Sequence, residues 1–425
     1  MITLKHIKNA AQIIENDIFR TPLVFSPQLA SVLGVKEVVL KLENLQYTGS
    51  FKERGVVNKL AELTPAQRAQ GVVCASAGNH SQALAYHALR MNIPASVVMP
   101  ETTPLNKISR CRSYGPQVIL SGQILDESII IAKEIAKNEK KVFIHPFDDE
   151  SIIAGQGTIG LEIFQDKPDL DYLIVPIGGG GLISGIATAV KALNPKIKII
   201  GVVSDAYPQL HERLQGGIVT HFSDTKRRET LADGIAVKKT GEFTFELIQK
   251  YVDEVLVVDE HFIELGVFML SEKQKFIVEG AGAVPLAAAL QYKHLFQDRK
   301  IGLVISGGNI DLRVLSSILM RGLMKAGRLA RINVCGSDAP GTLAKVASII
   351  SQKGGNVIDI FHQRVFYDSP VKRVDMQFMI EFESMQQMQI LIQSLNDEGF
   401  ETKATDSIKL LSEYYDDYKT VKLVS

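Results

Sequence analysis

The stretch with the most chemical potential is residues 48–55, TGSFKERG, in which small residues lead to an aromatic ring and then to Lys52. We predict that Lys52 begins a helix over 52–63. The N–H groups of a first helical turn lack intrahelical partners, and the helix dipole places partial positive charge there. In that field, and partly desolvated beside a ring, the neutral form of a lysine is favoured. A neutral amine attacks a carbonyl to form a Schiff base. Alternatively, Lys52 and Glu53 are ordinary solvated charges.

Three other stretches place small polar residues directly after an apolar strand. They are residues 76–80 (SAGNH), 178–182 (GGGGL) and 306–309 (SGGN), which follow strands predicted over 72–75, 172–177 and 301–305. The carboxyl ends of the strands of an open parallel sheet form the edge where ligands bind. We therefore expect all three turns at such an edge.

The glycine run at 178–181 has the features of an anion site. A turn without side chains lets backbone N–H groups and the next helix N-terminus approach a phosphate. A dinucleotide G-x-G-x-x-G frame does not fit, because it ends on Ile183 or Ser184, and no Walker lysine follows. Close packing of a helix on a sheet is the structural alternative.

These four motifs together resemble those of the fold-type II pyridoxal-phosphate enzymes, and within them the threonine dehydratases (threonine ammonia-lyases). The resemblance covers residues 5–325. It implies a two-lobed α/β catalytic domain like that of the tryptophan synthase β-chain, with pyridoxal 5'-phosphate as cofactor. It assigns cofactor binding to Phe51, Lys52, Asn79, Gly178, Gly179, Gly180, Gly181, Leu182 and Ser306. It assigns substrate binding to Ser76, Ala77, Gly78, Asn79 and His80.

The resemblance also implies individual roles, each with a simpler alternative. Phe51 stacks on the pyridine ring, or only packs in the core. Asn79 reaches the ring hydroxyl, or only caps a helix. His80 adjoins the substrate carboxylate, or is a catalytic base. Ser306 faces the pyridine nitrogen, or is a plain turn serine. Glu279 is a supporting carboxylate near the ring, or forms an ion pair.

The implied catalytic residue is Lys52, which holds the cofactor and then takes the Cα proton as general base. The implied reaction converts L-threonine to 2-oxobutanoate and ammonia, with L-serine to pyruvate as a side activity. Isoleucine biosynthesis is the implied pathway. Serine dehydratase, serine racemase and a non-catalytic amino-acid sensor are the alternatives. Ala77 stands where serine racemases use a serine as second acid, and Val203 stands where some relatives bind a cation. Racemisation and a metal are therefore not expected.

Alternation of short apolar strands with helices from residue 72 onward predicts parallel βαβ units. We expect an amphipathic helix over 5–19, a strand over 38–43, a smaller lobe at about 48–148 and a helix near 156–165. A catalytic domain of residues 1–325 results, with a cleft between its two lobes as the default ligand site.

A change of pattern near residue 325 predicts a second domain over 330–405 with βαββαβ order, including strands over 357–367 and 372–383 around the turn 368–370. It resembles the ACT domain, a regulatory module. An effector such as isoleucine or valine is then expected near Asp338, Gly341, Thr342 and Leu343, with pairing of subunits into a dimer or tetramer. The polar tail, 406–425, is assigned no role.

Composition indicates a soluble globular chain with two or three domains. The 425 residues include equal numbers of basic and acidic side chains, so nothing favours nucleic acid or an anionic membrane as a partner. Cys74, Cys111 and Cys335 are scattered without metal-ligand spacing. We expect reduced thiols and a cytoplasmic protein, since neither a signal peptide nor a membrane-spanning run is present.

Overall fold

The computed structural model describes residues 2–216, 229–363 and 372–404, and the chain divides into two compact units, Met1–Ile310 and Asp311–Ser425. The first unit contains two sheets, each flanked by helices, and the second contains one antiparallel sheet with helices. The predicted α/β class with a βαββαβ module is therefore confirmed.

The larger lobe of the first unit is built on a six-stranded sheet in the order β1-β2-β10-β7-β8-β9. All neighbouring strands are parallel except β1, which is antiparallel to β2. The strands are β1 (Leu23–Phe25), β2 (Glu37–Leu42), β7 (Tyr172–Pro176), β8 (Lys198–Ser204), β9 (Glu254–Val258) and β10 (Lys300–Ile305). The helices of this lobe are α1 (Leu4–Ile14), α2 (Pro27–Leu33), α8 (Glu150–Asp166), α9 (Gly181–Leu193), α10 (Gln209–Leu214), α11 (Glu242–Tyr251), α12 (Glu260–Gln274), α13 (Gly280–Gln291) and α14 (Lys293–Phe296).

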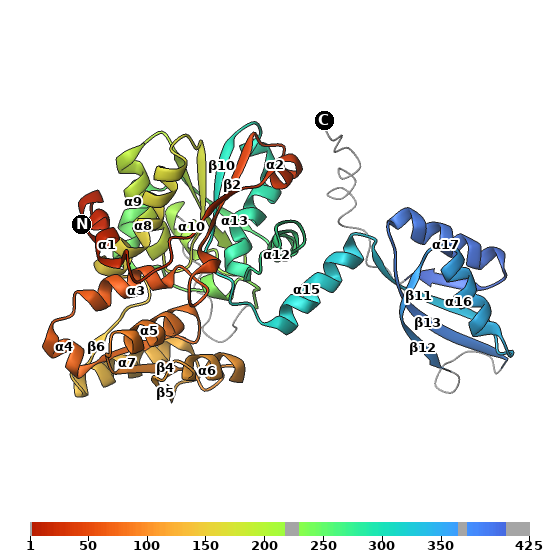
Figure 1. The fold of residues 1–425 in the computed structure, drawn as a ribbon, viewed down its shortest axis with the longest axis horizontal. Helices are drawn as coiled ribbons and strands as arrows, with labels where there is room; N and C mark the ends of the chain where they lie inside the picture. Colours follow the sequence, from red (N-terminus) through yellow and green to blue (C-terminus); the bar gives the residue numbers. More distant parts are fainter. Residues whose placement is uncertain (1, 217–228, 364–371, 405–425) are drawn as a thin grey trace. The chain divides into compact units, whose positions relative to one another are not determined.

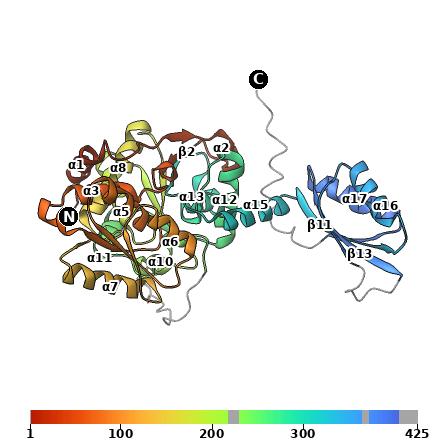
Figure 2. The same ribbon diagram turned by 60° about the horizontal axis from the view of Figure 1, so that its bottom comes forward.

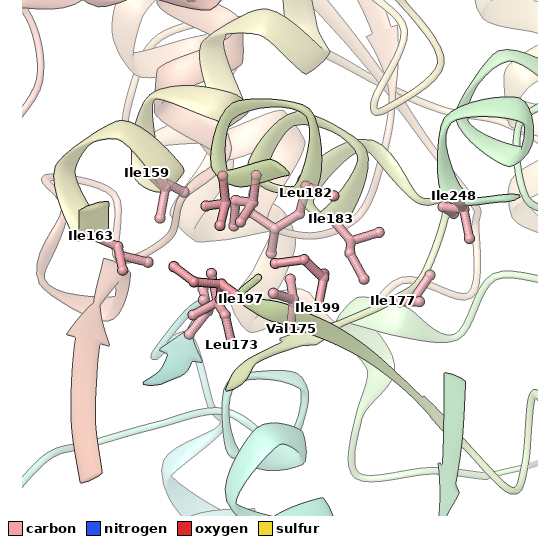
Figure 3. Packing of buried hydrophobic residues seen from close by; sticks show 14 of the residues in the cluster. Ile159, Ile163, Leu173, Val175, Ile177, Leu182, Ile183, Ile197, Ile199 and Ile248 are labelled. Atoms are coloured by element: carbon pink, nitrogen blue, oxygen red, sulfur yellow. The ribbon is translucent and has the colours of Figure 1, made fainter. Parts of the chain in front are cut away.

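The core of the larger lobe lies between α8, α9 and the strands β7 and β8. The strand residues are buried on both faces, which explains their nearly continuous aliphatic sequence. Figure 3 shows how the aliphatic side chains of both helices meet those of the strands, including Ile159, Ile163, Leu173, Val175, Leu182, Ile183, Ile197 and Ile199. This packing fixes the carboxyl end of β7, and with it the start of α9.

The smaller lobe is a four-stranded parallel sheet in the order β5-β4-β3-β6. Its strands are β3 (Val72–Ala75), β4 (Ala95–Met99), β5 (Gln117–Leu120) and β6 (Val142–Phe143), and its helices are α4 (Pro65–Gln70), α5 (Asn79–Arg90), α6 (Leu105–Arg112) and α7 (Leu125–Asn138). In Figure 1 these elements gather below the larger lobe, and α3 (Lys52–Ala61) lies where the two lobes meet.

The second unit begins with α15 (Leu312–Lys325) and continues with a βαββαβ fold. The elements are β11 (Leu329–Ser337), α16 (Thr342–Gln352), β12 (Asn356–Gln363), β13 (Arg373–Glu381), α17 (Met385–Asp397) and β14 (Glu401–Ala404). The sheet is antiparallel in the order β12-β13-β11-β14, and α16 and α17 cover one of its faces (Figures 1 and 2). The predicted turn 368–370, the last residues of the predicted strand 357–367 and the tail 406–425 lie outside the described residues.

The structure corrects several predicted elements. The first helix ends at Ile14 rather than at residue 19. Helix α8 begins at Glu150 rather than near 156, because the Asp149 side chain accepts hydrogen bonds from the N–H groups of Ser151 and Ile152 and caps it there. Helices α2, α4, α10, α14 and α15 were not predicted. The turns expected at one sheet edge lie on two sheets, since 76–80 follows β3 and the other two follow β7 and β10. Within the described ranges, no helix is long and apolar enough to span a membrane.

Close contact of α8 and α9 generates a stability prediction. A Cβ on Gly185 of α9 would overlap the backbone of Ile153 and Gly157 of α8. Gly185→Ala should therefore lower the free energy of unfolding by about 1–3 kcal/mol, as overpacking of a full core does. Ala192→Ser on the exposed side of α9 is the control and should change it by less than about 0.5 kcal/mol. Chemical denaturation followed by circular dichroism makes the measurement. Equal stability of both variants would contradict this account of the contact.

Candidate active site

The turn before Lys52 is attached to the turn that follows β10. Ser50 and Gly307 form an isolated antiparallel bridge, the Phe51 N–H donates to the Ser306 carbonyl at 3.1 Å, and the Gly308 N–H donates to the Gly49 carbonyl at 2.9 Å. Gly49 has a φ of +78°, a conformation that favours glycine. These bonds place the first turn of α3 beside the carboxyl end of β10, although the two segments are about 250 residues apart.

Lys52 is the first residue of α3, and its amine points to the turn after β6, where Nζ donates to the Pro146 carbonyl at 2.7 Å. Burial lowers the pKa of Lys52 to about 8, and the nearby Glu279 carboxylate offsets part of that effect. A substantial fraction of the amine is therefore neutral near physiological pH, as the sequence analysis expected from the helix start.

The glycine loop lies next to the same turn. Gly179 and Gly181 pack directly against Phe147, and a Cβ on either would overlap that residue. Gly180 has a φ of +95°, and the Thr244 hydroxyl donates to the Gly179 carbonyl at 2.8 Å. In the described part of the chain, the N–H groups of Gly178 to Leu182 donate to no protein acceptor. At the start of a 13-residue helix, these amides form a cradle for an anion such as phosphate.

Asn79 connects the smaller lobe to the larger one. Its Nδ2 donates to Glu279 Oε1 at 2.7 Å, and its Oδ1 accepts from Asn309 Nδ2 at 2.8 Å. Burial and the negative charge of Asp233 raise the pKa of Glu279 to about 7, while the Asn79 hydrogen bond acts in the opposite direction. The site therefore contains an amine and a carboxyl group that both titrate near neutral pH, which is a common property of catalytic sites.

His80 is buried behind Asn79, and its Nε2 lies 3.1 Å from the Ile144 carbonyl. Because a carbonyl only accepts, Nε2 carries the proton and Nδ1 is an acceptor, which is buried without a protein partner. Burial and the positive charge of Lys52 lower the pKa of His80 to about 3. So weak a base is poorly suited to proton abstraction at neutral pH, which argues against the catalytic-base alternative.

The remaining predicted site residues lie around these groups. Ser76, Ala77 and Gly78 form the half-buried turn between β3 and α5, where Ser76 Oγ accepts from the Gly78 N–H at 3.1 Å. Ser306 is buried at the end of β10. Phe51 is half-buried against the core of the larger lobe, with Lys52 Nζ 5.2 Å from its ring centroid. The predicted effector residues Asp338, Gly341, Thr342 and Leu343 lie in the second unit, at the turn that starts α16.

The two charged residues after Lys52 are structural anchors rather than solvated charges. Glu53 is fully buried, accepts from the Thr48 N–H and contacts His87 Nε2 at 3.0 Å. Arg54 is also fully buried and donates to both Glu43 and Glu162, at distances of 2.6–2.8 Å. Glu53 therefore closes the turn that precedes Lys52, and Arg54 fixes α3 to the end of β2 and to α8.

The buried charges around Arg54 balance one another. Glu162 also accepts from Lys41 Nζ at 2.5 Å, and Lys41 donates to the Thr21 carbonyl at 2.7 Å. Burial alone opposes the charged form of Glu43, but the Arg54 guanidinium holds the pKa of Glu43 below its usual value. Two carboxylates and two cations thus share one desolvated site next to the first turn of α3.

The structure brings together the predicted residues of four chain segments: Lys52, the 76–80 turn, the glycine loop and the turn after β10. Sequence reasoning missed Pro146 and Phe147, which link Lys52 to the glycine loop, and Asn309, which links the lobes. A signal existed for both, since His145-Pro146-Phe147 follows a strand and Asn309 ends a motif already singled out. No sequence signal indicated that Asp233 would lie near Glu279.

Comparisons with known proteins agree with this geometry. Residues 14–307, more than half of the chain, match the family described as pyridoxal-phosphate dependent enzyme. An L-threonine ammonia-lyase of Thermotoga maritima is 44% identical over 403 residues, which is 95% of this chain and 99% of that protein. A match of that length extends beyond the first unit and includes most of the second.

Two solved structures resemble the first unit. Maize serine racemase is 35% identical with a TM-score of 0.70, over 76% of this chain and 98% of that chain. A threonine deaminase from the organism abbreviated T.th. is 36% identical with a TM-score of 0.69, over 73% of this chain and 99% or less of its own length is not needed to see the correspondence, because each solved chain is matched almost completely. Both proteins therefore correspond to the first unit without the second.

The buried charge cluster generates a second stability prediction. Arg54→Met leaves Glu43 and Glu162 without their shared partner, so the free energy of unfolding should fall by about 3–5 kcal/mol. Arg20→Met is the matched control, because Arg20 pairs with Asp166 of the same helix α8 at the surface and should cost at most about 1 kcal/mol. Urea denaturation of both variants makes the comparison. A loss no larger than that of Arg20→Met would show that the cluster does not stabilise the fold.

Proposed function

The chain belongs to the family of pyridoxal-phosphate dependent enzymes, and we propose that it is an L-threonine ammonia-lyase that converts L-threonine to 2-oxobutanoate and ammonia. L-serine would give pyruvate as a side reaction. The observation that carries the proposal is a lysine amine with a pKa of about 8 beside the glycine loop and the Asn79 helix start. The similarity to the Thermotoga maritima L-threonine ammonia-lyase over 95% of this chain supports the choice of substrate.

The residues present fit the cofactor. The unpartnered amides of Gly178 to Leu182, together with the N-terminus of α9, suit its phosphate, and Lys52 offers an amine for its aldehyde. Phe51 and Ser306 lie on either side of the bond between the two turns and would adjoin its ring. Ser306 is neutral, whereas a charged partner would hold a proton on the pyridine nitrogen. The site therefore suits a cofactor that withdraws electrons only moderately.

When bound, pyridoxal phosphate supplies a carbonyl that captures the substrate amine and a conjugated ring that withdraws electrons from Cα. The helix start at Asn79 and His80 supplies backbone N–H groups to the substrate carboxylate. The His80 side chain does not donate there, since its Nδ1 is an acceptor. Freed Lys52 takes the Cα proton at Nζ, for which a pKa near 8 is well matched to neutral pH.

Glu279 completes the proposed arrangement. Its carboxyl group holds the Asn79 amide, and its raised pKa lets it carry a proton in part of the population at neutral pH. Lys52 and Glu279 influence each other's charge, so the protonation of the site is shared between them. Burial of both groups keeps bulk water away from the reacting Cα.

Racemisation is the second candidate, because maize serine racemase has the same fold. Ala77 lies in the turn between β3 and α5, on the residue before Gly78 and Asn79. A methyl group transfers no proton, so the face of the substrate opposite Lys52 lacks the second acid that racemisation needs. Elimination by Lys52 alone is therefore favoured.

Lys52→Ala should reduce keto-acid release from L-threonine by more than about 10²–10⁴-fold, since the proton-transfer group is removed. Lys59→Ala on the same helix is the control and should retain activity. Cofactor attachment to the wild-type apoprotein should accelerate as pH rises through about 8, because only the neutral amine reacts. Visible absorbance and a keto-acid assay measure these effects.

Two outcomes would contradict this assignment. One is substantial 2-oxobutanoate production by purified Lys52→Ala. The other is interconversion of D- and L-serine by the wild-type protein at a rate comparable with elimination, which would favour the racemase. An L-serine turnover well above that of L-threonine would make the chain a serine dehydratase.

We further propose that the second unit is an ACT-like regulatory domain that pairs between subunits. Its edge strand β12 exposes Ile358, Ile360 and Phe361, and an exposed apolar edge is usually covered by another chain. The turn at Asp338 and Gly341 offers N–H groups at the start of α16 to an amino-acid carboxylate. Isoleucine, or valine as its antagonist, is the proposed effector, with isoleucine biosynthesis as the pathway.

Truncation after Lys325 tests this role. The T.th. threonine deaminase matches the first unit alone, so the shortened chain should remain an active enzyme. Isoleucine should shift the threonine saturation curve of the full-length protein by a coupling of about 1–3 kcal/mol and leave the truncated protein unaffected. Size-exclusion chromatography should show a smaller oligomer after truncation. If neither isoleucine nor valine changes the full-length curve, these ligands are not effectors, and an unchanged oligomer would remove the pairing role.

A further inference from the structure

Helix α6 of the smaller lobe carries two cations that reach across to the larger lobe. Lys107 Nζ lies 2.5 Å from Asp233 Oδ2, and Arg110 Nη1 donates to Asn309 Oδ1 at 2.9 Å. Residues three apart on a helix lie on the same face, so both cations project from one side of α6. Their partners come from η2 (Asp233–Ile235) and from the turn after β10, far apart in sequence.

Arg110 fixes which way the Asn309 amide points. A guanidinium only donates, so Asn309 must present Oδ1 to it and therefore Nδ2 to the other side. There Nδ2 donates to the Thr48 carbonyl at 2.7 Å and to Asn79 Oδ1 at 2.8 Å. With its oxygen occupied in this way, Asn79 directs Nδ2 to the Glu279 carboxyl group. A chain of donors and acceptors thus runs from Arg110 to Glu279, and its direction is set by Arg110 at one end.

Lys107 and Asp233 act on the other side of the same carboxyl group. A Cβ on Gly234, the neighbour of Asp233, would lie 3.4 Å from Glu279 Oε1. The charged groups that face Glu279 are Asp233, Lys107 and Lys52, together with the amide of Asn79 and the backbone of Asn309. Asp233 favours the protonated form of Glu279, and Lys107 favours the charged form.

We propose that Lys107 and Arg110 form a latch that holds the smaller lobe against the larger one and orients Asn79 and Glu279 through Asn309 and Asp233. They are positioning residues, because neither contacts the reacting atoms. Both cations lie at the surface, and their removal leaves no buried charge, so the fold should tolerate their substitution. Only the kinetic consequences of the latch rest on the proposed function.

The first test uses Arg110. Arg110→Met frees the Asn309 amide to turn over, and kcat/KM for L-threonine should fall by about 10–100-fold, since small misplacement of site groups has effects of this size. Arg110→Lys keeps a donor and should restore most of the loss. Arg112→Met on the same helix is the control, because Arg112 is exposed and makes no contact with the larger lobe among the described residues. Equal kinetics of Arg110→Met and Arg112→Met would overturn the orienting role.

The second test separates electrostatics from simple bridging. Lys107→Met and Asp233→Asn break the same ion pair, but they should shift the pKa of Glu279 in opposite directions, upward for Lys107→Met and downward for Asp233→Asn. The pH profiles of kcat/KM and of the visible absorbance of the bound cofactor should move accordingly. Shifts in the same direction, or no shift in either variant, would show that the pair does not act on Glu279.

The third test does not depend on activity. Hydrogen exchange should accelerate in α6 and at residues 232–236 in Lys107→Met, and the exchanged pair Lys107→Asp with Asp233→Lys should slow it again. Unchanged exchange would remove the latch. If instead the latch variants behave as expected while the wild-type protein releases no keto acid from L-threonine or L-serine, the proposed function fails and the latch stands.

Discussion

The buried contact between Arg54 and the carboxylates of Glu43 and Glu162 is the interaction on which the site depends. It joins α3 to the end of β2 and to α8, two segments that belong to the large sheet and its helical cover. Because Arg54 lies only two residues after Lys52, the same contact fixes the first turn of α3. Unpaired charges at this depth would cost far more than a surface pair, so the cluster is retained only as a complete set. Charge balance within it, with Lys41 as the second cation, allows four ionised groups to occupy one desolvated site.

From this anchor the site is assembled mostly through backbone groups. The turn before Lys52 bonds to the turn after β10, Lys52 bonds to Pro146, and Phe147 packs on the glycine loop. Such contacts need close approach of main chains, which explains glycine at 49, 179, 181 and 307. Two sheets contribute to one site, since β3 and β6 belong to the smaller sheet and β7 and β10 to the larger. Relative placement of the lobes therefore decides whether the catalytic groups meet.

The electrostatics of the site follow from the same arrangement. Burial moves the pKa of Lys52 down to about 8 and that of Glu279 up to about 7, so an amine and a carboxyl group become interchangeable proton carriers near neutral pH. Burial also keeps His80 neutral and gives it a positional rather than a basic role. The side-chain amides of Asn79 and Asn309 connect these groups across the lobes. In this way the closure of the lobes and the protonation of the site are linked by a few polar contacts.

The sequence by itself determined the local elements and the kind of chemistry. Apolar periodicity predicted strands such as 72–75 and 95–99 and helices such as 342–352 and 385–397 with the observed bounds, because the pattern that forms an element lies within it. A lysine after small residues at a helix start was recognisable for the same reason. Tertiary structure decided the rest. Glu53 and Arg54 read as solvated charges until partners up to 108 residues away made them buried anchors. Asn309, Pro146 and Asp233 acquired their positions only when two sheets met, since a pairing between distant segments leaves no periodic signal in either one.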